Sequence, residues 1–277
     1  AARAWVDFLR AVTDHQTGNP HLWSRWSPPG YYEYYQRNVW ATNDGFRDFI
    51  FYSPLGYVLA QLGRTASVRL CTDVLMVKPT KDLLWHQDSQ NGPVDQADTI
   101  RWWVGMDRCG DGGVGAPIFL RGSHRNTTVG PTASTVDLGE GDLPAFAERP
   151  TDYVVEPGDL IAWDVRTIHR VIAPPAGTPR RAFGGTIAKA GAVYRRKDGY
   201  GSSDYINHGL EDGSPLTGPY FPCIFPQREP EEEACRSSGG VRREPRDQWD
   251  STVGAAAAAG LGLAKGLAAA LRFGGGS

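Results

Sequence analysis

This 277-residue chain has few cysteines and a small net charge. The four cysteines, Cys71, Cys109, Cys223 and Cys235, include no Cys-x-x-Cys pair, which argues against a zinc ribbon, and a chain of this length does not need a disulfide framework. Lys and Arg number 29 against 31 Asp and Glu, a formal charge of -2, so charge gives no reason to expect nucleic acid or an anionic membrane as partner. We therefore expect reduced cysteines and no nucleic-acid partner.

Long hydrophobic runs are also missing. The chain has no stretch of 18 apolar residues and no signal-like apolar start, so the sequence predicts neither a membrane-spanning helix nor a secretory signal. This favours a cytoplasmic protein. The chain begins with Ala1 and not with Met, which is compatible with removal of an N-terminal leader.

Turn-forming residues are abundant, with 34 Gly and 20 Pro. Helical spacing of apolar residues is clearest at 3–13 and at 44–62, where Pro54 indicates a break. From residue 66 to about 190 the chain reads as many short strands separated by turns. The pattern predicts a mainly β fold with flanking helices, which we interpret as a double-stranded β-helix of the jelly-roll, cupin-like type.

The chain divides into three predicted regions. Residues 1–65 form a helical and aromatic N-terminal extension packed on the core, and its aromatic segment 19–43 either packs on a sheet or covers a substrate. Residues 66–226 form the double-stranded β-helix catalytic core with a C-terminal wrap. Residues 227–277, a charged linker and an Ala/Gly-rich tail, are expected to be disordered or weakly helical.

An imidazole and a carboxylate stand two residues apart where an apolar run ends, in Trp85-His86-Gln87-Asp88. Residues i and i+2 of an extended strand project from one face, so His86 and Asp88 can approach one metal ion while Gln87 points away. A second histidine would complete the two-His, one-carboxylate face of non-haem Fe(II) oxygenases. Alone, a His-x-Asp pair is a weak signal.

The third ligand can be argued by elimination, because the chain has only six histidines. His169 follows a Pro-Gly-Asp turn and an apolar strand, and it begins another strand. This arrangement allows a distant strand to present His169 beside His86 and Asp88. The competing interpretation is a core histidine with satisfied hydrogen bonds.

An arginine pair, Arg180-Arg181, follows His169 by eleven and twelve residues. A metal that activates O2 needs an electron source, and 2-oxoglutarate can supply two electrons. A guanidinium group matches its distal carboxylate in bidentate geometry. Neighbours on a strand face opposite ways, so only one of the two arginines can point inward.

These residues resemble the phytanoyl-CoA dioxygenase-like family of Fe(II)/2-oxoglutarate oxygenases over roughly residues 66–190. The matching pieces occur in the family's order: Lys78-Pro79, Trp85-His86-Gln87-Asp88, Trp102-Trp103-Val104-Gly105-Met106-Asp107, Arg121-Gly122-Ser123-His124-Arg125, Pro157-Gly158-Asp159, His169 and Arg180. The Gly-Ser-His piece and the spacing from His to Arg are the most specific of them.

The resemblance implies Fe(II) bound by His86, Asp88 and His169, with 2-oxoglutarate as cosubstrate, O2 as co-reactant and a small molecule as substrate. It also implies that Arg180 anchors 2-oxoglutarate and that Trp103 lines the pocket. Halogenating relatives replace the carboxylate with a small residue, so Asp88 favours hydroxylation.

The Gly-Ser-His element implies a turn beside the site, so His124 is not assigned to iron. Many members have Pro where this chain has Arg121, which faces either the pocket or solvent. Candidate substrate-pocket positions are Gln87, Ser89, Asn91 and Arg101. Two alternatives stay open: a cupin-like metalloenzyme that does not use 2-oxoglutarate, and a non-catalytic binding or sensing relative.

Overall fold

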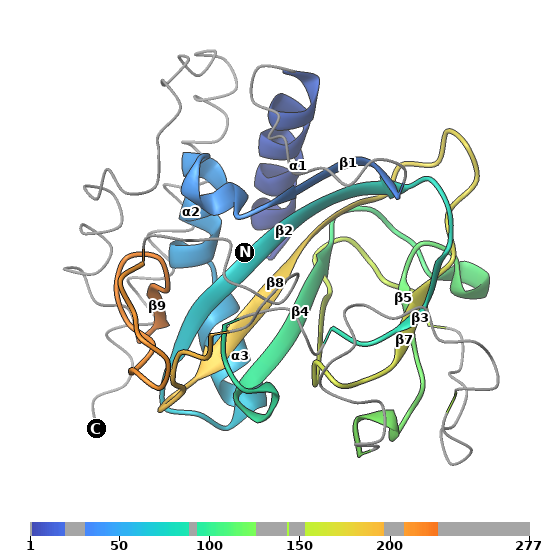
Figure 1. Cartoon of the computed structure of the whole chain (residues 1–277). Helices are drawn as coiled ribbons and strands as arrows, with labels where there is room; N and C mark the ends of the chain where they lie inside the picture. Colours follow the sequence, from blue (N-terminus) through green and yellow to red (C-terminus); the bar gives the residue numbers. More distant parts are fainter. Residues whose placement is uncertain are drawn as a thin grey trace, which may run out of the picture.

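The computed structural model describes residues 2–19, 31–88, 93–125, 143, 153–196 and 208–226 (Figure 1). The 227–277 tail, residues 20–30 of the aromatic segment, and Ser89, Asn91 and Cys235 lie outside this part of the chain, and so do the expectations for them. Cys71, Cys109 and Cys223, which lie within it, form no disulfide with one another.

A large antiparallel sheet runs diagonally through the molecule (Figure 1). Its strand order is β1-β2-β8-β4-β6, and β9 also pairs with β2. These strands are β1 (Tyr32–Arg37), β2 (Val68–Pro79), β4 (Thr99–Gly105), β6 (Leu160–Trp163), β8 (Arg181–Lys189) and β9 (Cys223–Phe225).

A second, three-stranded sheet lies beside the first and has the order β3-β7-β5. It contains β3 (Leu83–His86), β5 (Pro117–Phe119) and β7 (His169–Val171), all antiparallel. Two facing antiparallel sheets of short strands form the jelly-roll architecture, so the predicted fold class is confirmed.

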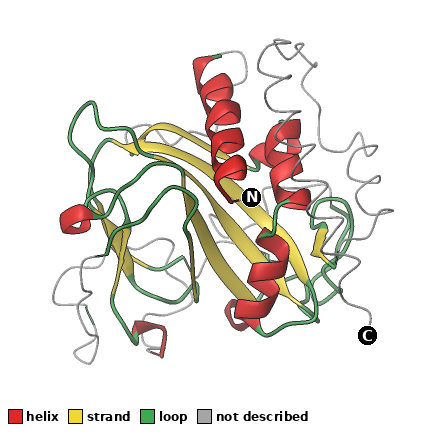
Figure 2. Cartoon of the chain, turned by 180° about the vertical axis from the view of Figure 1, so that it is seen from behind, coloured by secondary structure: helices red, strands yellow, loops and turns green. Residues whose placement is uncertain are grey.

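Three helices cover the face of the large sheet that lies toward the viewer in Figure 2. They are α1 (Ala2–Gly18), α2 (Asp44–Tyr52) and α3 (Leu55–Gly63). Asn43 caps α2, because its side-chain oxygen accepts hydrogen bonds from the backbone N–H groups of Gly45 and Phe46. Pro54 separates α2 from α3, as its position predicts. Short 3-10 turns lie at Val39–Ala41, Gln96–Asp98, Asp111–Gly113 and Ser123–Arg125.

Side-chain alternation gives the large sheet two different faces. On β4, Trp102 and Val104 join the core shared with the helices, whereas Trp103 packs in a separate cluster on the opposite face. On β8, Phe183 joins the helix-side core and Ala182 joins the Trp103 cluster. The face that carries Trp103 meets the small sheet, so the space between the sheets is the place for a site.

Two strands, β1 and β9, were not expected from the sequence pattern. β1 lies inside the segment assigned to an N-terminal extension, where Tyr34 pairs with Val77 and aromatic residues on both faces conceal the alternation. β9 is three residues long, too short to show a period. The large sheet therefore begins at Tyr32.

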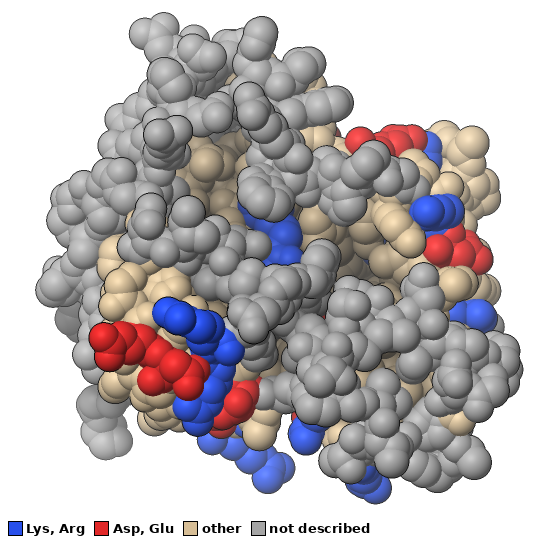
Figure 3. Space-filling model, in the orientation of Figure 1, with Lys and Arg blue, Asp and Glu red and all other residues tan. Residues whose placement is uncertain are grey.

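Where the face in Figure 3 is described, acidic and basic side chains lie next to one another, at the lower left and at the right. Within the described ranges, no helix has the length and apolar character needed to cross a membrane.

Candidate metal centre and cosubstrate pocket

The structure brings together the three residues expected to bind a metal. One ligand atom from each of His86, Asp88 and His169 lies within 4.8 Å of the other two, and all three residues are buried. His169 Nε2 is 3.4 Å from Asp88 Oδ2, and the two imidazole centroids are 4.2 Å apart. A buried cluster of two imidazoles and one carboxylate is a set of donors that a divalent transition metal can bind.

The pairing of β3 with β7 positions the two histidines. His86 and His169 are direct partners in this antiparallel pair, which places their side chains on one face of the small sheet. Each imidazole is then oriented by a backbone carbonyl two residues earlier in the chain. His86 Nδ1 is 2.7 Å from the Leu84 carbonyl oxygen, and His169 Nδ1 is 3.0 Å from that of Thr167.

These carbonyl contacts fix the tautomer of both histidines. A carbonyl oxygen only accepts, so each Nδ1 carries the proton and each Nε2 keeps its lone pair for a metal. Burial, reinforced by the neighbouring His86, lowers the pKa of His169 to about 4, although the Asp88 charge acts in the opposite direction. His169 is therefore neutral at pH 7, the form that binds metals.

Asp88 lies two residues beyond the end of β3, so the expectation that it shares a strand with His86 is wrong in detail. The backbone leaves the ladder after His86, and Asp88 N–H donates to the Val165 carbonyl at 3.0 Å. Gln87 points away as expected, because its amide donates to the Arg166 carbonyl. The loop before β7 thus holds Asp88 in place of a strand neighbour.

Aromatic rings from both sheets enclose His169. The Trp163 ring lies edge-on to it with centroids 5.3 Å apart, and Phe119, its β5 partner, lies at 5.8 Å. Neither ring figured among the candidate residues of the sequence, although Phe119 and Trp163 both stand in predicted strands. Their role depends on strand register, which pattern alone does not supply.

Arg180 is the inward member of the arginine pair. Its side chain is buried, its Nε donates to the Gly115 carbonyl at 2.8 Å, and its Cζ is 5.2 Å from the centre of the Trp103 ring. Gly115 has φ of +79°, a conformation suited to glycine. Burial lowers the pKa of Arg180, but the guanidinium stays protonated at neutral pH. Its Nη1 is buried with no hydrogen-bond partner, and it forms no ion pair with any described residue.

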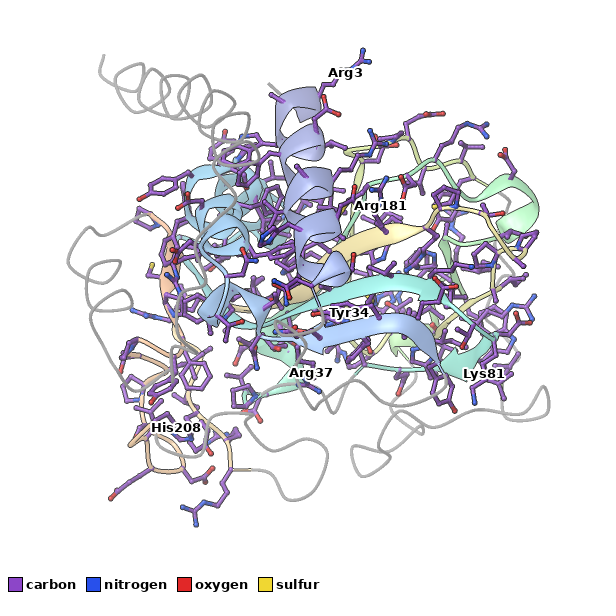
Figure 4. The ribbon with its side chains drawn as sticks, turned by 90° about the horizontal axis from the view of Figure 1, so that it is seen from above. Arg3, Tyr34, Arg37, Lys81, Arg181 and His208 are labelled. Atoms are coloured by element: carbon purple, nitrogen blue, oxygen red, sulfur yellow. The ribbon has the colours of Figure 1, made fainter. Side chains whose placement is uncertain are left out.

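Arg181 points the other way, toward α1 (Figure 4). It donates to Asp107 at 2.7 and 3.0 Å and to Asp14 of α1 at 2.7 and 2.9 Å. Burial acts to raise the pKa of Asp107, but the hydrogen bonds and charge of Arg181 outweigh it and hold that pKa below its ordinary value. Because Arg181 pairs with both carboxylates, its side chain lies on the helix side of the large sheet.

The remaining candidates lie elsewhere. Arg121 is exposed, which favours the solvent-facing alternative, and His124 lies in the 3-10 turn after β5. His208 packs against Tyr194 with ring centroids 4.5 Å apart and planes tilted by 57°, and against Phe221 of the C-terminal segment (Figure 4). Arg101, a candidate pocket residue, instead lies against Asp88.

The residues present fit a divalent iron ion and 2-oxoglutarate. His86, Asp88 and His169 offer two neutral nitrogens and one carboxylate, and such a face leaves open positions on an iron ion. The Nη1 of Arg180 is buried without an acceptor, so its N–H groups can donate hydrogen bonds to a carboxylate. The site therefore offers a metal face and a separate carboxylate anchor.

Comparison with known proteins agrees with this geometry. The model of the family "Phytanoyl-CoA dioxygenase (PhyH)" matches residues 35–181, more than half of the chain. No curated protein matches the sequence significantly.

Among solved structures, the non-haem α-ketoglutarate-dependent epimerase SnoN from nogalamycin biosynthesis is 20% identical with a TM-score of 0.62, over 80% of this chain and 88% of its own. The carbocyclase SnoK from nogalamycin biosynthesis is 20% identical with a TM-score of 0.59, over 79% and 86%. EctD from S. alaskensis, solved with 2-oxoglutarate and 5-hydroxyectoine, is 14% identical with a TM-score of 0.52, over 69% and 70%. At these identities the likeness establishes the fold.

Proposed function

This chain belongs to the phytanoyl-CoA dioxygenase family, and on that premise we propose that it is an Fe(II)- and 2-oxoglutarate-dependent dioxygenase that hydroxylates a small molecule at a C–H bond. The observation that carries the proposal is a pairing of two features. A buried two-His, one-carboxylate face and a buried arginine with an unsatisfied Nη1 both lie in the space between the sheets. A metal site alone would not need the arginine.

His86, Asp88 and His169 would hold the iron. The Leu84 and Thr167 carbonyls orient the two rings and keep both Nε2 atoms available for a metal. The SnoN structure in complex with Fe3+, α-ketoglutarate and nogalamycin RO shows this fold with iron and the cosubstrate, at 21% identity and a TM-score of 0.61, over 79% of this chain and 89% of its own.

Arg180 would hold the distal carboxylate of 2-oxoglutarate, with Trp103 beside it. The guanidinium is fixed by Gly115, so binding requires little ordering of its side chain. The Trp103 indole also has a buried Nε1 with no acceptor among the described residues, and its ring covers one side of the guanidinium. Arg181, occupied by Asp107 and Asp14, is unsuited to this role.

The bound iron and 2-oxoglutarate would supply the oxidising power, with O2 and the C–H substrate giving an alcohol, succinate and CO2. The protein contributes ligands, orientation and exclusion of water. The rings of Trp163 and Phe119 around His169 keep that side of the site dry, which protects a reactive centre from side reactions. Retention of Asp88 supports hydroxylation over halogenation.

The test is to measure succinate from 2-oxoglutarate under air, with and without Fe(II), in wild type and in His86→Ala, Asp88→Ala and His169→Ala. Each substitution removes a ligand, so Fe(II)-dependent succinate release should fall by at least 100-fold. Mass spectrometry after turnover under 18O2 separates hydroxylation, which places one labelled oxygen in the product, from other oxidations. Iron binding without 2-oxoglutarate binding would favour the cupin-like alternative, and binding of both without succinate release would favour a sensing relative.

A further inference from the structure

Two buried hydrogen-bond donors lie side by side on the face of the large sheet that meets the candidate metal ligands. Arg101 of β4 and Trp163 of β6 are direct partners in an antiparallel pair, so their side chains project from one face with Cβ atoms about 5 Å apart. The Arg101 side chain is 10% exposed and its Nε is 3.2 Å from Asp88 Oδ2, and the Trp163 ring centroid is 5.3 Å from that of His169. This donor pair, Arg101 and Trp163, therefore lies beside the metal centre.

Both members of the donor pair have an N–H group that no described residue accepts. Arg101 Nε and Trp163 Nε1 are buried, and neither has a hydrogen-bond partner in the described part of the chain. The contact of Arg101 with Asp88 is an ion pair without an aligned hydrogen bond, whereas its Nη1 donates to the Thr186 hydroxyl at 3.3 Å. Buried donors without acceptors cost free energy, so the donor pair is suited to a ligand that brings acceptor oxygens.

The buried charges between the sheets do not balance. Within the described residues, Asp88 is the one buried carboxylate in this space, against the guanidinium groups of Arg101 and Arg180. The other buried charged side chains are engaged elsewhere: Asp107 with Arg181, Arg47 with Asp44, and Asp73 with the backbone N–H groups of Val39 and Trp40. His86 and His169 bind a metal as neutral groups. Fe(II) and 2-oxoglutarate would add charges that cancel, so one positive charge stays uncompensated, which favours an anionic ligand.

We propose that Arg101 and Trp163 bind the substrate, and that the substrate carries a carboxylate group that accepts hydrogen bonds from both. This inference rests on the proposed function and adds a substrate class to it. A single uncompensated charge matches a carboxylate better than a doubly charged phosphate, and the guanidinium group matches a carboxylate in shape. Arg180 then serves the cosubstrate beside Trp103, while Arg101 holds the substrate next to the metal ligands.

The experiment uses the whole chain loaded with Co2+ and saturated with 2-oxoglutarate, without O2. The probes are phenylacetate and octanoate, each compared with its neutral primary amide. Paramagnetic relaxation of the probe protons by Co2+, corrected with the Zn2+-loaded protein, measures binding close to the metal. We expect each carboxylate to bind at least tenfold more tightly than its amide, because only the carboxylate supplies the missing negative charge.

Substitutions test whether this preference belongs to the donor pair. Arg101→Met removes the charge and should reduce the preference for the carboxylate to less than threefold, whereas Arg101→Lys keeps the charge without the planar fork and should restore part of it. Trp163→Phe keeps a ring but removes the N–H, so it should weaken carboxylate binding by about fivefold. Arg47→Met, which removes a buried arginine of α2 on the helix side, is the matched control and should leave the preference unchanged.

Equal binding of carboxylate and amide by wild type, or binding of neither, would overturn the inference. A preference that survives Arg101→Met would also overturn it, because the carboxylate would then be bound by the metal itself. If Arg101→Met does not fold, Arg101→Lys and Trp163→Phe decide, since each must weaken carboxylate binding. Failure of Co2+-loaded wild type to bind 2-oxoglutarate would instead contradict the proposed function.

Discussion

Replacing Arg180 with Met separates cosubstrate binding from folding. The guanidinium is buried, bonded through Nε to the Gly115 carbonyl, and has no ion pair within the described residues. We expect its acidic partner to be the distal carboxylate of 2-oxoglutarate. Methionine has a similar volume and no charge, so it removes the anchor with little change in packing.

The magnitude for binding follows from the burial of the pair. Removing one partner of a buried, hydrogen-bonded charge pair costs about 3–5 kcal/mol, and each 1.4 kcal/mol is tenfold in affinity. Arg180→Met should therefore weaken 2-oxoglutarate binding by about two to three and a half orders of magnitude. Metal affinity should not change, because His86, Asp88 and His169 do not contact the substituted side chain in any hydrogen bond or ion pair of the structure.

Without 2-oxoglutarate, Arg180→Met should change the free energy of unfolding very little, although the substituted arginine is buried. An isolated buried charge is costly, and its replacement by an apolar group is often neutral or stabilising, whereas loss of the bond to Gly115 costs about 1 kcal/mol. The free energy of unfolding without 2-oxoglutarate should stay within about 1 kcal/mol of wild type. At 100 times the dissociation constant, 2-oxoglutarate should add about 2.7 kcal/mol to wild type and almost nothing to the variant.

Calorimetric titration of metal-loaded protein and urea unfolding with and without 2-oxoglutarate measure these quantities. Arg181→Met is the matched control, adjacent in sequence but bound to Asp107 and Asp14, and it should leave 2-oxoglutarate affinity within a few-fold of wild type. The reasoning is refuted if Arg180→Met binds 2-oxoglutarate within threefold of wild type, or if Arg181→Met has the larger effect.

Three further predictions follow from the described contacts. The pKa of His169 is about 4 in the fold against about 6.5 when unfolded, so the unfolded chain binds the extra proton and the metal-free protein loses stability as pH falls from 6.5 toward 4, by about 1.4 kcal/mol per pH unit. Urea unfolding across this range should show a shallower pH dependence in His169→Gln, and equal slopes would contradict the assignment. Asp14→Asn should lower the free energy of unfolding by at most about 1 kcal/mol, because the Asp14 side chain is 62% exposed. Asp107→Asn should lower it by more, because the Asp107 side chain, the other partner of Arg181, is only 11% exposed. Equal losses in urea unfolding would show that burial does not decide the strength of these ion pairs. Asn43→Ala should cost about 1 kcal/mol through loss of the α2 cap, and an unchanged unfolding midpoint would mean that water replaces the cap.

The sequence predicts the fold and much of the site because both leave local signals. His86 and Asp88 follow an apolar strand, His169 begins another, and Pro54 divides two helices, all of which can be read within a few residues. Alternation says that one of the two neighbours Arg180 and Arg181 points inward without saying which. The family resemblance selects Arg180, and in the structure its side chain is the buried one.

The contacts between the two sheets could not be predicted from the sequence. Asp88 is held by the loop at Val165 rather than by β3, and Arg101 reaches it from β4 across the gap between the sheets. Trp163 joins His169 for the same reason. Each contact depends on the register and packing of distant strands, and a one-residue slip would turn these side chains to the other face.

The central claim is that His86, Asp88 and His169 bind iron and that the iron-loaded site then binds 2-oxoglutarate. Equilibrium dialysis without O2 tests it most directly, with Fe(II) and 2-oxoglutarate measured together in wild type and in His169→Ala. We expect one equivalent of each in wild type, loss of both in the variant, and release of 2-oxoglutarate when a chelator removes the iron. Retention of 2-oxoglutarate without iron, or iron binding unaffected by His169→Ala, would contradict it.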